Sequence, residues 1–136
     1  MGRVLAIDWG GRRTGIAVTD PLRISCNPLP TIPTNTLQDW LKKYTQIEVV
    51  DEIVVGMALR LNGEDTHSTA PITAFIEKLK TDFTIPVFTV DERLSSKEAK
   101  YYIQNSGLKK SKRKEKGLVD SVSATIILQT HLNMLL

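Results

Sequence analysis

Three acidic residues occupy positions where a carboxylate is unusual. Asp8 lies inside a short apolar run, Glu92 follows another such run, and Asp120 stands at the start of an apolar stretch near the C-terminus. A charge within a buried element is costly unless a partner compensates it. Each acid alone has an ordinary explanation: a hairpin contact, an ion pair with Arg93, or the preference of acids for the first turn of a helix. All three in one place would repel each other unless a cation lay between them.

The expected cation is a hard divalent metal. With one cysteine, Cys26, and two histidines, His67 and His131, the chain supplies a zinc site poorly. Carboxylate oxygens are instead the ligands that suit Mg²⁺ or Mn²⁺. Two such ions, about 3.5–4 Å apart, would activate a water and stabilise the leaving oxygen in phosphodiester hydrolysis. The three acids therefore predict a metal-dependent nuclease.

A basic block ends four residues before Asp120. Residues 109–116 read KKSKRKEK, in a chain whose formal net charge is +3. The block is either a solvated loop that aids solubility or a phosphate contact, because clustered Lys and Arg are the electrostatic footprint of nucleic-acid binders. The full set of expected phosphate contacts combines it with three arginines near the acids: Arg12, Arg13, Arg93, Lys109, Lys110, Lys112, Arg113, Lys114 and Lys116.

Alternating strands and helices must position these side chains. Short apolar runs predict strands over 3–9, 14–19, 52–57 and 85–90, while the three prolines within 24–33 allow at best an edge strand. Apolar residues at helical spacing, with a capping box at Ser95 and Glu98, predict helices around 37–44, 72–83, 95–107 and from 118 onward. Ser121 and Ser123 are expected to be small residues that let the last helix pack closely.

The predicted fold class is α/β, with a mixed sheet flanked by helices. A leading antiparallel hairpin comes before strands that alternate with helices, and this order favours parallel pairing of the later strands. Carboxylates at strand ends and at a helix start then converge at one edge of the sheet, where ligand sites of α/β domains usually form.

Length and composition favour a single cytoplasmic domain over residues 1–136. A chain of 136 residues with 41% hydrophobic content fits one domain and can bury a core. A lone cysteine excludes an internal disulfide and suits a reducing compartment. No apolar run is long enough to cross a membrane, and the first residues do not have the pattern of a signal peptide.

Four segments resemble the YqgF/RuvX-like family in order and spacing. They are DWGGRRTGIAVTD at 8–20, VVGMALRLNG at 54–63, VDERLSSKEA at 90–99 and VDSVSATIIL at 119–128, so the resemblance covers essentially the whole chain. Members are described as Holliday-junction resolvases and as nucleases that mature the 5′ end of precursor small-subunit ribosomal RNA. The resemblance implies a ribonuclease-H-like fold with a three-carboxylate, divalent-metal site.

The resemblance also assigns individual positions. The acids of the family match Asp8, Glu92 and Asp120, the same three reached from the residues alone. Arg13, Gly15 and Arg93 match the basic and glycine positions of its motifs, and together these matches identify a candidate site. One departure is Gly56-Met57-Ala58, where the family commonly has Gly-x-Pro. Loss of that proline bears on substrate geometry and removes no expected metal ligand.

Several functions remain open at this point. The leading hypothesis is a nuclease that processes the 5′ end of precursor 16S rRNA in ribosome biogenesis, and the alternative is a Holliday junction resolvase acting as a two-fold dimer. Phosphate charge does not separate RNA from DNA, and the chain is expected to be a monomer or a homodimer. An ATPase related to the actin superfamily would need two such domains. A non-catalytic RNA-binding factor would use the acids only structurally.

Overall fold

The computed structural model describes residues 2–57, 69–91 and 116–132, with only the backbone described for 69, 91 and 116–121. The strands are β1 (Arg3–Asp8), β2 (Arg13–Thr19), β3 (Cys26–Pro33), β4 (Val50–Met57) and β5 (Val87–Asp91). A 3₁₀ turn (Thr34–Thr36) leads into α1 (Leu37–Ile47), and the other described helices are α2 (Thr69–Asp82) and α5 (Lys116–His131). The predicted helix over 95–107 lies outside the described residues.

The strands form one mixed sheet in the order β3-β2-β1-β4-β5. β1 pairs antiparallel with β2, and β2 with β3, whereas β4 pairs parallel with both β1 and β5. The predicted hairpin and the parallel pairing of the later strands are therefore confirmed. β3 lies at the edge, where its prolines at 28, 30 and 33 interrupt the fewest ladder hydrogen bonds.

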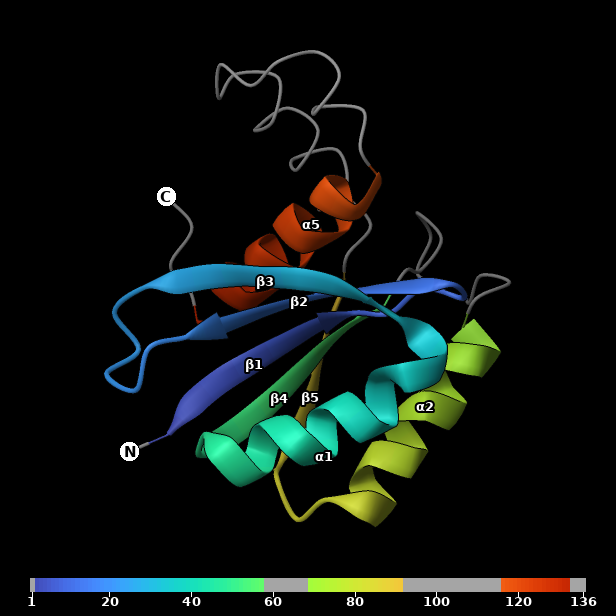
Figure 1. Cartoon of the computed structure of the whole chain (residues 1–136), viewed down its shortest axis with the longest axis horizontal. Helices are drawn as coiled ribbons and strands as arrows, with labels where there is room; N and C mark the ends of the chain where they lie inside the picture. Colours follow the sequence, from blue (N-terminus) through green and yellow to red (C-terminus); the bar gives the residue numbers. More distant parts are fainter. Residues whose placement is uncertain (1, 58–68, 92–115, 133–136) are drawn as a thin grey trace.

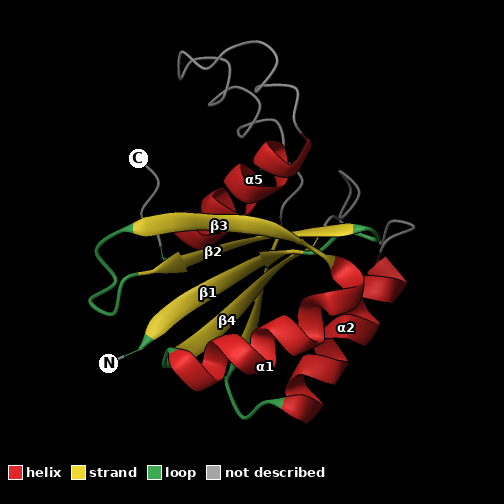
Figure 2. Cartoon of the chain, in the orientation of Figure 1, coloured by secondary structure: helices red, strands yellow, loops and turns green. Residues whose placement is uncertain are grey.

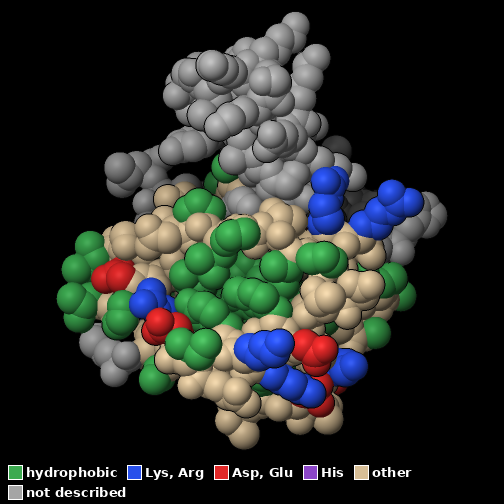
Figure 3. Space-filling view, viewed as in Figure 1, with side chains coloured by type: hydrophobic (Ala, Val, Ile, Leu, Met, Phe, Trp, Pro, Cys, Tyr) green, Lys and Arg blue, Asp and Glu red, His purple; other side chains and the backbone are tan. Residues whose placement is uncertain are grey.

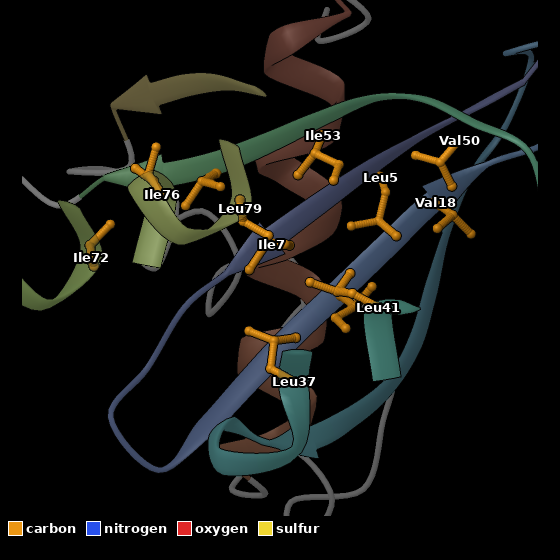
Figure 4. Packing of buried hydrophobic residues seen from close by; sticks show 12 residues of the cluster. Leu5, Ile7, Val18, Leu37, Leu41, Val50, Ile53, Ile72, Ile76 and Leu79 are labelled. Carbon is orange, nitrogen blue, oxygen red and sulfur yellow. The ribbon is translucent and has the colours of Figure 1, made fainter. Parts of the chain in front are cut away.

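Helices cover the two faces of the sheet (Figures 1 and 2). α1 and α2 pack against one face, where β1 contributes Leu5 and Ile7 (Figure 4). α5 packs against the other face, where β1 contributes Val4 and Ala6. Successive side chains of a strand point to opposite faces, so one strand supplies both cores. Each fully buried Leu or Ile contributes about 1.5–3 kcal/mol relative to an exposed one.

Small residues line the contact between α5 and the sheet. Ser123 is one of them, as expected, whereas the side chain of Ser121 lies outside the described residues. Ala6 and Ala17 on the strands face Ala124 on the helix in one buried cluster, and Ser123 beside it is also buried. Side chains as short as those of alanine and serine allow the backbone of the helix to approach the backbone of the strands closely. None of the described helices combines the length and apolar character needed to cross a membrane.

Most predicted strand boundaries differ from the structure by one or two residues, and two of these differences have identifiable reasons. β4 begins at Val50, before the predicted start, because Val50 pairs with Arg3 although the polar Asp51 follows it. β1 ends at Asp8, where pairing with Gly15 stops. Trp9 leaves the strand and its ring stacks on Phe75 of α2, with centroids 6.2 Å apart.

Candidate active site

Asp8 ends β1 on the face of the sheet that α5 covers. Val4 and Ala6, four and two residues earlier, both pack in the α5 cluster. Strand alternation places Asp8 on that same face. Asp8 pairs with Gly15 of β2, so no side chain stands opposite it in the hairpin. The carboxylate thus lies at the carboxyl end of a central strand.

The direction of α5 places Asp120 at the same edge of the sheet. At the C-terminal end of α5, the His131 Nε2 atom lies 2.9 Å from Glu52 Oε1, near the beginning of β4. The His131 ring also lies 5.1 Å from the ring of Phe88, near the beginning of β5. The helix therefore runs from the carboxyl edge of these parallel strands back to their amino edge.

Helix and strand lengths agree with this placement. From His131 to Asp120 the helix extends about 16 Å, and from Glu52 to Met57 the strand extends about 16 Å as well. Asp120 also stands one helical turn before Ala124, which is buried against the sheet. The backbone of Asp120 is thus level with the ends of β1 and β4.

β5 ends at this same edge of the sheet. Met57 at the end of β4 pairs with Asp91 at the end of β5. Glu92 follows Asp91 directly in the chain but lies outside the described residues. Arg93, Ala58, His67 and the block from Lys109 to Glu115 also lie outside, and Lys116 is placed only as the first residue of α5.

The two arginines after Asp8 reach the same edge. Arg12 is exposed in the β1–β2 turn, and Arg13 begins β2 opposite Pro33. Because β2 is antiparallel to β1, the start of β2 lies beside the end of β1. Figure 3 shows basic side chains over this end of the molecule, at the upper right.

Thr34 anchors the turn that follows Asp8. Its Oγ1 atom donates to the carbonyl oxygen of Gly10 across 2.5 Å, and its backbone N–H donates to the carbonyl oxygen of Arg12 at 2.9 Å. A hydroxyl has a single proton, so the 2.9 Å contact with Thr14 Oγ1 has Thr14 as donor. Thr14 is fully buried, so the packing around it also holds its side chain in place.

These two threonines are positioning residues that the sequence analysis missed. Thr34 is distant in sequence from Gly10, and a threonine after a proline is an ordinary loop residue. Gly10 adds a second constraint, because a Cβ at this position would overlap the carbonyl oxygen of Arg13. Gly11 next to it has open space around its Cβ position. The sequence predicted the turn but not the contacts that hold its shape.

The donor chemistry at this edge fits a hard divalent cation. Asp8 offers carboxylate oxygens at the end of β1, and the backbone of a second acid, Asp120, lies in the first part of α5. The described cysteine and histidine, Cys26 and His131, lie elsewhere. Within the described side chains no group of three or more His, Cys, Asp or Glu could hold a metal. A complete ligand set accordingly requires residues beyond them, such as Glu92.

Cys26 and His131 belong to other parts of the fold. Burial, and to a smaller extent the charge of Asp20, raises the pKa of the Cys26 thiol above its ordinary value. That shift opposes formation of the thiolate, the reactive form of a cysteine. His131 pairs with Glu52 at the amino edge, at the end of α5 away from Asp120.

The architecture belongs to the ribonuclease-H-like class of α/β folds. The fowlpox virus Holliday junction resolvase superposes with a TM-score of 0.58 at 12% identity, over 98% of this chain and 99% of that one. RuvC of T. thermophilus, in complex with a Holliday junction substrate, superposes with a TM-score of 0.61 at 13% identity, over 98% and 96% of the two chains. At these identities the likeness establishes the fold.

Sequence comparison identifies the family. The model of the RuvX family, described as Holliday junction resolvase, matches residues 2–134, and the chain belongs to this family. A relative from Porphyromonas gingivalis is 48% identical over 98% of this chain and 97% of its own length. One from Flavobacterium johnsoniae is 44% identical over 98% and 97%. Both carry the name "Putative pre-16S rRNA nuclease".

Proposed function

We propose that this chain is a divalent-metal-dependent nuclease that processes the 5′ end of precursor 16S rRNA. The observation that carries the proposal is the convergence of Asp8 and of the Asp120 backbone at one edge of a ribonuclease-H-like sheet. The names of relatives at 44–48% identity support the ribosomal RNA substrate. Such processing places the protein in the cytoplasm, in ribosome biogenesis.

Asp8, Glu92 and Asp120 would hold Mg²⁺ or Mn²⁺. The bound metal would supply an activated water and charge stabilisation at the leaving oxygen. Asp8 keeps its position because β1 is central in the sheet and Thr34 braces the turn that follows it. α5 sets the distance of Asp120 from Asp8, since it is clamped by Ala124 at the sheet and by His131 at its far end.

Basic side chains would hold the nucleic-acid backbone beside the acids. Arg12 and Arg13 lie at the edge where Asp8 ends its strand. Arg93 follows Glu92 in sequence, and the block 109–116 leads directly into α5. Contacts of this kind neutralise phosphates and make binding depend on salt rather than on base sequence.

A Holliday junction resolvase is the second candidate function. The description of the family favours it, and the two structural neighbours are a Holliday junction resolvase and a protein bound to a Holliday junction. A resolvase makes paired nicks and would work as a two-fold dimer. Processing of one RNA end requires no such symmetry, so the oligomeric state of the chain also distinguishes the two candidate functions.

The test compares cleavage of two substrates by the full chain. One is a labelled RNA that spans the immature 5′ end of 16S rRNA, and the other is a labelled DNA four-way junction, each with Mn²⁺, Mg²⁺ or EDTA. We expect metal-dependent cleavage of the RNA, lost by orders of magnitude in Asp8→Asn and Asp120→Asn. Glu77→Gln, an exposed change on α2, is the matched control and should cut normally.

Each other outcome overturns a stated part of the proposal. Cleavage of the junction alone would establish the resolvase. Near-normal cutting by Asp8→Asn would overturn the assignment of the carboxylates. If neither substrate were cut while Asp120→Asn still bound RNA as the unaltered chain does, the protein would be a binding factor instead.

A further inference from the structure

A group of exposed apolar side chains lies at the end of the sheet opposite the candidate active site. Its members are Leu22 (64% exposed), Ile24 (70%), Ile47 (80%) and Val49 (66%). They come from the β2–β3 turn, from the end of α1 and from its connection to β4. We call this region the amino-edge surface, since β1 and β4 begin there. It comprises these four residues and the acidic residues beside them: Asp20, Glu48, Asp51 and Glu52.

Direct contacts hold the two halves of this surface together. Arg23, between Leu22 and Ile24, places its Nη2 atom 3.2 Å from Asp51 Oδ2. The same Asp51 oxygen accepts a 2.8 Å hydrogen bond from the Gly2 backbone N–H. The β2–β3 turn is therefore fixed against the beginning of β4, two residues after Val49. Figure 3 shows apolar, acidic and basic side chains gathered at this end, on the left.

The turn that carries Leu22 and Ile24 is rigidly built. Asp20 Oδ1 accepts hydrogen bonds from the backbone N–H groups of Ile24 (2.7 Å) and Ser25 (2.8 Å). Arg23 has φ of 59°, in the left-handed region that residues other than glycine rarely adopt. Two apolar side chains are thus held out in solvent by an ordered turn with a strained residue between them. Strain of this kind persists only where the surroundings impose it.

Charge at the amino-edge surface selects the kind of partner. Among the described side chains here, Asp20, Glu48, Asp51 and Glu52 are acidic, against the arginines at 3 and 23. Both arginines are engaged: Arg3 with Glu48 at 3.2 Å, and Arg23 with Asp51 and Glu52. Glu52 also pairs with His131. The four carboxylates outnumber the two guanidinium groups, so these side chains carry a net negative charge although the whole chain has a net charge of +3.

An acidic, apolar surface disfavours two occupants. A nucleic-acid backbone would be repelled, since phosphate binding requires a basic surface. A second copy of this chain in a two-fold dimer would bring the same acids face to face. A basic protein segment with apolar side chains satisfies both features of the surface.

We propose that the amino-edge surface docks a basic segment of a protein bound to the same precursor RNA. The choice of an RNA-bound protein rests on the proposed function, because proteins that coat ribosomal RNA are basic. Docking there leaves the carboxyl edge, with Asp8, free for the RNA. The partner would thereby bring the nuclease to an assembling particle rather than to any RNA.

The test measures binding of the full chain to small-subunit ribosomal proteins, each purified singly, by biolayer interferometry without RNA. We expect at least one to bind, more weakly at high salt, and the double variant Ile24→Ser/Ile47→Ser to weaken that binding about tenfold or more. Ala74→Ser, which alters an exposed apolar residue on α2, is the matched control and should bind normally. Leu22→Ser should weaken binding as well, and serves if the double variant folds poorly.

Three outcomes would overturn the proposal. The first is that no ribosomal protein binds, and the second is that one binds the double variant as tightly as the unaltered chain. The third is that light scattering shows a dimer of the unaltered chain and a monomer of the double variant, which assigns the surface to a second copy. Cleavage of naked precursor RNA, measured in parallel, should be unchanged in the double variant. If neither the unaltered chain nor any variant cleaves RNA while a ribosomal protein still binds, the proposed nuclease function fails but the assignment of the docking surface is retained.

Discussion

Thr34 donates its hydroxyl proton to the carbonyl oxygen of Gly10 across 2.5 Å, joining the end of β3 to the turn that follows Asp8. The same hydroxyl accepts from the buried Thr14. One side chain therefore satisfies a backbone acceptor in the turn and a buried donor in β2. The position of this turn relative to Asp8 depends on a residue outside the hairpin.

Replacement of Thr34 by valine should loosen this turn. Thr34→Val keeps the side-chain shape but leaves Gly10 O and the Thr14 hydroxyl unpaired, so we expect a loss of about 1–3 kcal/mol in the free energy of unfolding. Cleavage should fall with it. Thr34→Ser retains the hydroxyl and should stay close to the unaltered chain. Urea denaturation and cleavage assays measure the two effects, and equal behaviour of the valine and serine variants would contradict the anchoring role.

Gly10 should tolerate no side chain, in contrast to its neighbour. Gly10→Ala places a methyl group against the carbonyl oxygen of Arg13, so the backbone after Asp8 must shift. Gly11→Ala meets nothing within 4 Å. We expect the first variant to lose stability and cleavage activity and the second to keep both. Thermal unfolding and cleavage rates of the pair test this, and a normal Gly10→Ala protein would show that the turn adapts freely.

Ser123 should be replaceable by alanine at no cost. Its Oγ atom is buried and has no hydrogen-bond partner among the described residues. Ser123→Ala removes a hydroxyl that was desolvated without compensation, so stability should be unchanged or higher by about 1 kcal/mol. The reverse change in the next residue, Ala124→Ser, should destabilise, because Ala124 is packed in the α5 cluster. Chemical denaturation distinguishes them, and a clear loss of stability in Ser123→Ala would reveal a missing partner for the hydroxyl.

The Cys26 thiol should react slowly at neutral pH. Burial, and then the charge of Asp20, raises its pKa above the ordinary 9.0, so the folded protein disfavours the thiolate. The folded pKa exceeds the unfolded one, so the resulting stability is complete below pH 9.0 and declines as pH rises through the folded pKa. Alkylation by iodoacetamide, followed against pH, should show a midpoint above 9.0. Asp20→Asn should lower that midpoint, and an unshifted midpoint would exclude the contribution of Asp20.

The basic block should contribute to the salt dependence of RNA binding. Substitution of Lys109, Lys110, Lys112 and Lys114 by glutamine should weaken binding to RNAs of any sequence and flatten the slope of log K against log salt. Substitution of Lys42 and Lys43, exposed on α1, is the control. An unchanged slope would return the block to a solvated loop.

Local patterns in the sequence determined the elements and the class of fold. The continuous apolar run within 3–9 predicts a strand buried on both faces, and helical spacing from Leu37 to Tyr44 predicts α1, because each pattern follows from the backbone geometry of one element. The family motifs could also be found in the chain, since their residues are close together within each segment. Asp8 and Asp120 were therefore predictable as candidates before any contact was known.

Only the tertiary structure decided how these elements face one another. The direction of α5 depends on His131 meeting Glu52, and the turn after Asp8 depends on Thr34 meeting Gly10. The exposure of Leu22 and Ile47 on one surface was equally invisible, since apolar residues in a turn and at a helix end resemble core residues in a sequence. Such contacts join residues distant in the chain, and no local periodicity encodes which partner a side chain will meet once the sheet and helices have packed.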